Sequence, residues 1–145
     1  MFRHLLIATD GSPASEKAVA QGLQLAKDLG ARVTAVTVTE PWTEGAYATL
    51  PTPSLIEVYE KAAAGRAAAI LDSVKRAAGD ASVPCRTRHI NGQHAADGII
   101  KAAKDEGCDL IIVGSHGRGA VGRVLLGSTS LKVLTFSPSS VIICR

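Results

Sequence analysis

Three glycines and a serine near the end of the chain have the spacing of a phosphate-binding loop. Gly114, Gly117 and the pair Gly127-Ser128 follow the apolar run Leu110 to Val113, which gives the pattern Gly-x2-Gly-x9-Gly-Ser directly after an expected strand. Glycines let the backbone turn sharply and approach a ligand closely, because no Cβ stands in the way. Ser128 stands where a helix should begin, and the N–H groups and positive dipole end of a helix N-terminus attract anions. The spacing therefore favours the binding of a phosphate group.

The charge around this loop also suits an anion, because the chain carries no Asp or Glu after Asp109. The basic residues beyond that point are Arg118, Arg123, Lys132 and Arg145. An anion would meet little repulsion there. The same residues fit a plainer interpretation, in which the glycines only form a surface loop and Ser128 only caps a helix.

Strands alternate with helices along the chain. A first strand is expected from His4 to Thr9, and Ser12 and Pro13 then begin a helix that Gly30 ends. Further strands are predicted over Arg32 to Thr39, Val83 to Ile90, Asp109 to Val113 and Val141 to Cys144. Further helices are predicted over Leu55 to Ala78, Gln93 to Glu106 and Ser128 to Phe136.

The spacing of apolar residues predicts which face each helix buries. The first helix is expected to bury Ala18, Leu25, Ala26 and Leu29. The long Ala-rich helix is expected to bury Tyr59, Ile70, Val74 and Ala77, and the next one Ala95, Ile99, Ala102 and Ala103. Between Glu40 and Ser54 the pattern is irregular, and a segment of this length is typical of a functional lid or of disorder.

This alternation predicts an α/β fold: a single domain, residues 1–145, with a doubly wound, parallel five-stranded sheet in the Rossmann-like order 3-2-1-4-5 and helices on both faces. Arg86, Arg88 and His89 interrupt the third strand, which suits a sheet edge. Ligands bind such sheets beyond the carboxyl ends of the strands, where the winding direction reverses. Asp10 and Gly114 end two strands, and they face each other across one crevice if those strands are neighbours.

The bulk properties exclude several classes of protein. The 145 residues are 46% hydrophobic and only 3% aromatic, and the net charge of +3 comes from scattered basic residues, so nucleic acid is not an expected partner. No stretch reaches membrane-spanning length, and the apolar N-terminal run is too short for a signal peptide, which predicts a soluble, cytoplasmic protein without a membrane partner. Cys85, Cys108 and Cys144 have no metal-binding spacing and are expected to be buried free thiols.

Several other sequence patterns do not indicate a function. Residues 117–122 spell Gly-x-Gly-x-x-Gly, but they do not belong to the first strand-helix unit and no acidic residue follows for a ribose, so a dehydrogenase is not expected. The Walker and hydrolase-elbow patterns are absent. The four histidines are far apart, and no metal site is predicted; only His116 is of interest, because it lies in the glycine loop.

Three segments together resemble the universal stress protein family. They are Ala8-Thr9-Asp10-Gly11-Ser12, the run Val113-Gly114-Ser115-His116-Gly117-Arg118-Gly119, and Leu125-Leu126-Gly127-Ser128. The ending Val141-Ile142-Ile143-Cys144-Arg145 is similar as well. The resemblance covers the whole chain, and the glycine spacing is that of the family's ATP-binding branch.

The resemblance implies a role for each residue of a nucleotide site. Asp10 would bind the ribose or adenine side, with Ala8 and Thr9 lining the pocket, and Val38 would contact adenine. Gly114 and Gly117 would approach the ribose and phosphates, and Gly127, Ser128 and Thr129 would contact phosphates. Val113, His116 and Arg118 complete the predicted site. From its position alone, Asp10 could instead cap the first helix.

The function implied is that of an ATP-binding regulatory or stress-response module, in which nucleotide, with or without Mg²⁺, changes the conformation of the protein or its affinity for a protein partner. The resemblance further implies a homodimer through the strand Val141 to Cys144. One alternative is slow ATP hydrolysis or another nucleotide-handling activity, although the sequence shows no dedicated catalytic base. The other is a nucleotide-free dimeric interaction protein.

Overall fold

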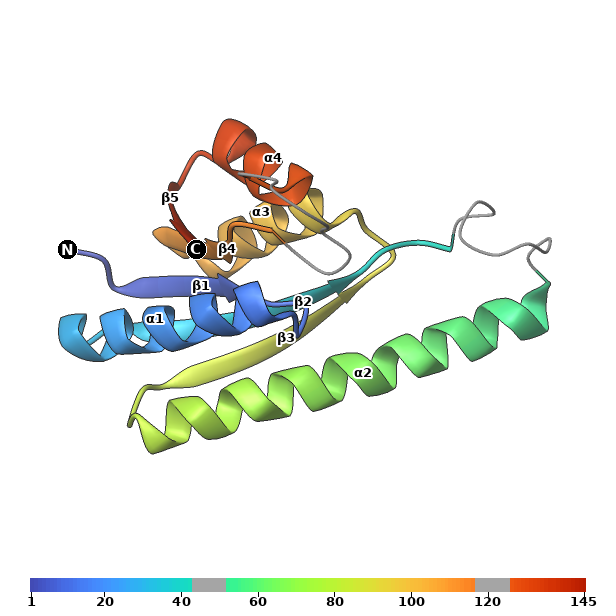
Figure 1. Ribbon diagram of the computed structural model, residues 1–145, viewed down its shortest axis with the longest axis horizontal. Coiled ribbons are helices and arrows are strands. Elements are labelled where there is room, and N and C mark those ends of the chain that lie inside the picture. The colour runs from blue at the N-terminus through green and yellow to red at the C-terminus, as the bar shows by residue number, and fades with distance from the viewer. Residues whose placement is uncertain (43–51, 117–125) are drawn as a thin grey trace.

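The computed structural model describes residues 1–42, 52–116 and 126–145. Five strands and four helices alternate within these ranges (Figure 1). The strands are β1 (His4–Ala8), β2 (Arg32–Thr39), β3 (Cys85–Asn91), β4 (Leu110–Gly114) and β5 (Ser140–Cys144). The helices are α1 (Pro13–Leu29), α2 (Pro53–Asp80), α3 (Ala95–Glu106) and α4 (Ser128–Phe136).

The five strands form one parallel sheet in the order β3-β2-β1-β4-β5, so the predicted fold class and strand order are confirmed. The winding direction reverses between β1 and β4, where Leu5 lies opposite Leu110 and Ile7 opposite Ile112. β3, with its charged residues, is an edge strand, as its sequence indicates. The carboxyl ends of β1 and β4 therefore lie side by side at the point where ligands bind in such sheets.

Helices cover both faces of the sheet, α1 and α2 on one face and α3 and α4 on the other (Figure 1). Alternate residues of β1 point to opposite faces, so Leu5 and Ile7 pack into the cluster with α1 and α2, and Leu6 packs into the cluster with α3 and α4. All three side chains are fully buried. Burial on both faces explains why the central strands are continuous apolar runs rather than alternating ones.

The helix ends follow the predicted local signals. The side chain of Ser12 accepts a hydrogen bond from the Ser15 N–H, and Pro13 is the first residue of α1. Gly30 and Gly107 end α1 and α3 in the left-handed conformation, with φ of 66° and 70°, which glycine adopts without strain. No helix in the described ranges is both long and apolar enough to cross a membrane.

The predicted buried faces of the helices are only partly correct. In α2 the buried residues are Ala63, Ala67, Leu71, Val74 and Ala78, whereas Ala77 is exposed and Tyr59 and Ile70 are half-buried. In α1 and α3, Leu29 is 41% exposed and Ala96 rather than Ala95 is buried. An Ala-rich helix has apolar residues all round, so its apolar pattern does not define one face. Element ends differ from the prediction by one or two residues, which is usual where helices and strands end.

His4, the first residue of β1, is a buried titratable residue that is only 5% exposed. Its Nε2 lies 2.8 Å from Thr34 Oγ1, and its Nδ1 has no hydrogen-bond partner within the described ranges. Burial, and next the positive charge of Arg32, lower the pKa of His4 below 6.5. The ring is therefore neutral in the folded protein at neutral pH.

We expect the free energy of unfolding to fall as the pH decreases from about 6.5 toward the lowered pKa of His4, because the unfolded chain binds the proton more readily in that range. Each unit of pKa depression removes about 1.4 kcal/mol. Urea unfolding between pH 7.5 and 5 should show this slope in the wild type and a flatter dependence in His4→Gln. Asp109 does not contribute to this slope, because its pKa is lowered in the folded protein and its titration therefore changes the free energy of unfolding only below about pH 3.8. Equal slopes would contradict the assignment to His4.

Candidate functional site

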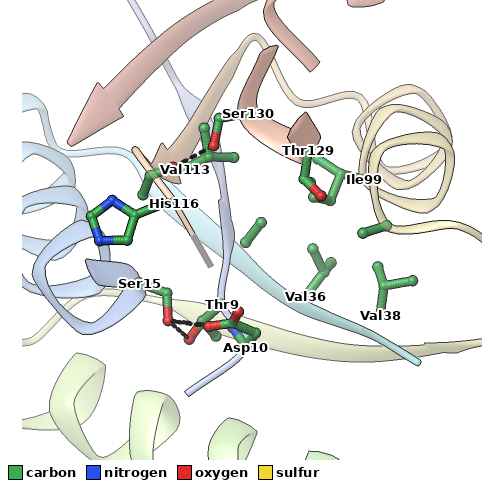
Figure 2. Close-up of a pocket in the computed structure, with 13 residues that line it drawn as sticks. Thr9, Asp10, Ser15, Val36, Val38, Ile99, Val113, His116, Thr129 and Ser130 are labelled. Carbon is green, nitrogen blue, oxygen red and sulfur yellow. Dashed lines mark hydrogen bonds between the residues drawn. The ribbon is translucent and has the colours of Figure 1, made fainter. Parts of the chain in front are cut away.

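A cavity of about 110 Å³ opens at the carboxyl ends of β1, β2 and β4, between the first turns of α1, α3 and α4 (Figure 2). Eight of the residues predicted for a nucleotide site line this cavity: Ala8, Thr9, Asp10, Val38, Val113, Gly114, His116 and Thr129. Asp10 and Gly114 thus share one crevice, as their positions at the ends of neighbouring strands predict. Gly127 and Ser128, the two residues before Thr129, lie at the start of α4 and do not line this cavity. Gly117 and Arg118 lie outside the described residues.

One side of the cavity is an apolar slot. Val36 and Val38 of β2 form one wall, and Ala95 and Ile99 of α3 form the other. A Cβ on Gly98 would lie 3.1 Å from both methyl carbons of Val38, so the glycine lets α3 pack tightly against β2 there. Two close apolar walls suit a flat aromatic ring.

The backbone of Val38 faces the same crevice. Val36 accepts a hydrogen bond from the Thr9 N–H at 3.0 Å, so its peptide groups point toward β1. Along a strand, the backbone N–H and C=O groups of successive residues point to alternate sides. The N–H and C=O of Val38, two residues after Val36, therefore also point toward the β1 side. Because β1 ends at Ala8, opposite Val36, the N–H and C=O of Val38 point past its end into the crevice. They present one donor and one acceptor side by side.

Polar side chains gather at the opposite wall, where β1 turns into α1 (Figure 2). Asp10 Oδ1 accepts hydrogen bonds from the Ser12 N–H at 2.8 Å and from the Ser15 hydroxyl at 2.9 Å. Thr9 Oγ1 lies 3.0 Å from Ser15 Oγ. Asp10 therefore supports the start of α1 as well as lining the cavity, so the two roles weighed for it from sequence are compatible.

The N-terminus of α4 forms the third part of the site. Gly127 is its N-cap residue and provides no side-chain cap, so Ser128 and Thr129 begin a helix with a positive dipole end. The helix is fixed in place by the Ser130 hydroxyl, which donates to the Gly114 carbonyl at 2.5 Å, and by the Gly127 N–H, which donates to the Ser115 carbonyl at 2.6 Å. This arrangement suits an anion.

Two of the motif glycines stand where segments of the protein pack closely against each other. A Cβ on Gly114 would lie 3.0 Å from the backbone C and O of Ala14, in the first turn of α1. A Cβ on Gly127 would lie 3.1 Å from His116 Cα and 3.3 Å from the Ser115 oxygen. Their spacing predicts close approach to a ligand, and the structure shows that each also permits close approach between two segments of the chain.

His116 completes the wall next to α4. Its side chain is exposed, lines the cavity, and has Nδ1 3.0 Å from the hydroxyl of the buried Ser115. That contact orients the ring from the β4 side. The whole Gly-x-Gly-x-x-Gly motif (117–122) and most of the irregular segment between Glu40 and Ser54, residues 43–51, lie outside the described residues.

Segments remote in sequence meet beside the site. The Glu40 carboxylate accepts a hydrogen bond from the Ala95 N–H at 3.3 Å, at the start of α3, where the N-cap residue His94 gives no side-chain bond. The Tyr59 hydroxyl donates to the Glu40 carbonyl at 2.8 Å, and the Tyr59 ring packs edge-on against Trp42. The end of β2 thus ties α2 to the α3 wall of the cavity.

Sequence reasoning missed five residues that line the cavity: Ser15, Val36, Ala95, Ile99 and Ser130. Ser15 and Ser130 each lie one to five residues from a predicted site residue, so helical spacing could have indicated them. Ala95 and Ile99 carry no local signal, because only the winding of the sheet brings α3 to this end.

The model of the universal stress protein family matches residues 1–145. Universal stress protein YxiE of Bacillus subtilis is 32% identical over 155 aligned positions that cover 100% of each chain, and a universal stress protein of Thermus aquaticus is 32% identical over 145, again covering 100% of each. Among solved structures, universal stress protein UspA of Lactobacillus plantarum matches with a TM-score of 0.83 at 25% identity, covering 99% of this chain and 98% of that one. A universal stress protein in complex with cAMP matches with a TM-score of 0.74 at 26% identity, covering 99% and 97%.

Proposed function

The chain belongs to the universal stress protein family, and on that premise we propose that it binds an adenine nucleotide, ATP first, in the crevice between β1 and β4 and acts as a nucleotide-dependent regulatory module. The observation that carries the proposal is the convergence of an apolar slot, a carboxylate and a helix N-terminus on one cavity. These three environments match a base, a ribose and phosphates. The cAMP-bound relative also supports a nucleotide ligand.

The ligand can be placed part by part. Adenine would lie between Val38 and Ile99, the ribose hydroxyls would reach Asp10, and the phosphates would extend toward Gly127, Ser128 and Thr129, with His116 beside them. The cavity volume of about 110 Å³ lies below the 300–1,000 Å³ of typical small-molecule sites. The described walls therefore enclose only part of a nucleotide, which leaves the phosphates at the open end of the cavity, beside the start of α4.

Magnesium would enter with the phosphates in this proposal. Asp10 is the one carboxylate among the described residues that line the cavity. Mg²⁺ in nucleotide sites is commonly bound through few carboxylates together with the phosphates of the substrate. The ion would therefore be held mainly by the nucleotide, and its role would be to neutralise phosphate charge.

Adenine should be preferred to guanine. The N–H and C=O of Val38 match the N1 acceptor and N6 donor of adenine, whereas guanine presents a donor at N1 and an acceptor at O6. Two groups that lose their hydrogen-bond partners on binding are costly, so GTP should bind at least about tenfold more weakly than ATP. Calorimetric titration with the Mg²⁺ complexes of ATP and GTP measures the ratio.

CTP is the control for binding through phosphates alone. Equal affinity for all three nucleotides would contradict base recognition at Val38 and would reduce the proposal to an anion site at α4. Failure of all three to bind at millimolar concentration would contradict the nucleotide function as a whole.

We also propose a homodimer through β5. This strand is the second sheet edge, and Ile142 on it is 37% exposed, close in sequence to the exposed Leu131, Leu134 and Phe136 of α4. An apolar edge strand is usually paired or covered. Antiparallel pairing of Val141 to Cys144 with the same strand of a second copy would cover it, and a light-scattering mass of one chain would refute this part.

A cytoplasmic location fits the cysteines. Cys85, Cys108 and Cys144 are unpaired. Burial raises the pKa of the Cys108 thiol to about 11 and raises the pKa values of the other two, so all three are protonated at neutral pH. Protonated thiols are poor nucleophiles, so these cysteines suit packing in a reducing compartment.

A further inference from the structure

Ser15, in the first turn of α1, is a buried hydroxyl at the edge of the cavity. Its residue is 5% exposed and lines the cavity together with Thr9 and Asp10. Its Oγ lies 2.9 Å from Asp10 Oδ1, 3.0 Å from Thr9 Oγ1 and 3.2 Å from Ser12 Oγ. It also accepts a hydrogen bond from the Asp10 N–H at 3.3 Å. Ser15 is thus the centre of the polar network at the end of β1.

The single proton of the Ser15 hydroxyl decides how this network is ordered. Three acceptors compete for it: Asp10 Oδ1 at 2.9 Å, the Ser12 carbonyl at 3.0 Å and Thr9 Oγ1 at 3.0 Å. Hydrogen bonds to a carboxylate are the stronger ones, so the proton belongs to Asp10. The Thr9 hydroxyl, which accepts from the Gly11 N–H at 3.2 Å, then donates to Ser15 Oγ. The chain of donors ends on the carboxylate, and such chains strengthen each bond along them.

The position of Ser15 is itself fixed by close packing. A Cβ on Gly114 would lie 3.2 Å from the Ser15 nitrogen, so β4 and the first turn of α1 are in tight contact there. Asp10, by contrast, is only half-buried and stands in the turn between β1 and α1. Its Oδ1 is held by the Ser12 N–H on one side and by the Ser15 hydroxyl on the other. Ser15 is therefore the more deeply buried partner of the pair, and its hydroxyl holds the Asp10 carboxylate from the side of α1.

We propose that Ser15 is a positioning residue, whose hydroxyl fixes the Asp10 carboxylate in the orientation that binds the ribose hydroxyls and so sets a preference for ribonucleotides over deoxynucleotides. The inference rests on the proposed nucleotide function. It makes a separate claim, because the sugar preference can be lost while adenine and phosphate binding remain.

The test compares the affinities for ATP, 2′-deoxy-ATP and 3′-deoxy-ATP in the wild type, Ser15→Ala and Ser12→Ala. A hydrogen bond to a charged group discriminates by about tenfold or more, so the wild type should bind at least one deoxy analogue that much more weakly than ATP. Ser15→Ala should lower this ratio to about twofold or less, with the affinity for the deoxy analogue nearly unchanged.

Ser12→Ala is the matched control, since it removes a neighbouring buried hydroxyl and the α1 cap but leaves the Ser15 bond to Asp10. It should lower the melting temperature and keep the sugar preference. Ser15→Cys has a side chain of similar size with a weaker hydrogen-bond donor, and it should reduce the ratio of ATP affinity to deoxy-analogue affinity about threefold or more. This variant tests the positioning role if Ser15→Ala does not fold.

Each outcome bears on a different claim. A wild-type ratio that survives in Ser15→Ala or Ser15→Cys overturns the positioning role, and so does an equal loss in Ser12→Ala. A wild type that binds ATP and both deoxy analogues equally overturns this inference and leaves the nucleotide function standing. A wild type that binds none of them overturns both, and is distinguished by the absence of any titration signal.

Discussion

Gly114→Ala should lower the free energy of unfolding by about 2–3 kcal/mol. The added Cβ would lie 3.0 Å from the backbone C and O of Ala14, and these atoms belong to a helix turn that cannot rotate away as a side chain can. The same turn carries Ser15, which holds Asp10. Displacement of α1 should therefore weaken nucleotide binding along with stability.

Urea unfolding and thermal melting measure the loss, which corresponds to roughly 5–10 °C in melting temperature. Gly65→Ala is the matched control, because a Cβ there meets nothing within 4 Å and Ala is favoured over Gly within a helix by about 1 kcal/mol. Gly65→Ala should be neutral or stabilising. Equal stability of the two variants would contradict the close contact between β4 and α1.

Ser128→Asp should weaken ATP binding by about 10- to 100-fold while leaving adenosine binding within about twofold. Ser128 is exposed at the start of α4, so the substitution removes no buried contact. An acidic residue in the first turn of a helix stabilises it by about 0.3–1 kcal/mol, so lost affinity cannot be ascribed to lost folding. The new carboxylate would repel the phosphates that are proposed to bind there.

Gln21→Glu is the control for the change in net charge. Gln21 is exposed on α1 and does not line the cavity, so this variant should bind ATP as the wild type does. Titration of both variants with ATP and with adenosine separates the effect on phosphates from the effect on the base. Unchanged ATP affinity in Ser128→Asp would contradict a phosphate position at α4.

Much of the fold could be predicted from local signals. The apolar runs Leu5 to Ala8 and Leu110 to Val113 indicate central strands, because only strands buried on both faces are apolar without alternation. The caps at Ser12 and Gly30 mark helix ends through their own backbone chemistry. The buried face of α2 could not be predicted, because alanines such as Ala77 and Ala78 differ in burial and not in type.

The candidate site was predictable where one strand-helix unit contains it. Thr9 and Asp10 directly follow β1 and Gly114 ends β4, and the order of the sheet brings them together. Ile99 lies on α3, which packs closely against β2 at Gly98. No residue near Ile99 in the sequence indicates that it lines a cavity. The role of Gly114 could not be predicted fully either. Its spacing in the sequence is the same whether the missing Cβ makes room for a ligand or for the neighbouring helix α1.

The central claim is that adenine meets Val38 and phosphates meet the start of α4 in one crevice. Titration of ¹⁵N-labelled protein with ATP·Mg²⁺, followed through backbone amide shifts, tests it directly. We expect saturable shifts at the amides of Val38, Ser128 and Thr129, with adenosine moving the first and leaving the other two largely unchanged. Shifts confined to other parts of the chain, or none at millimolar ATP, would contradict the account.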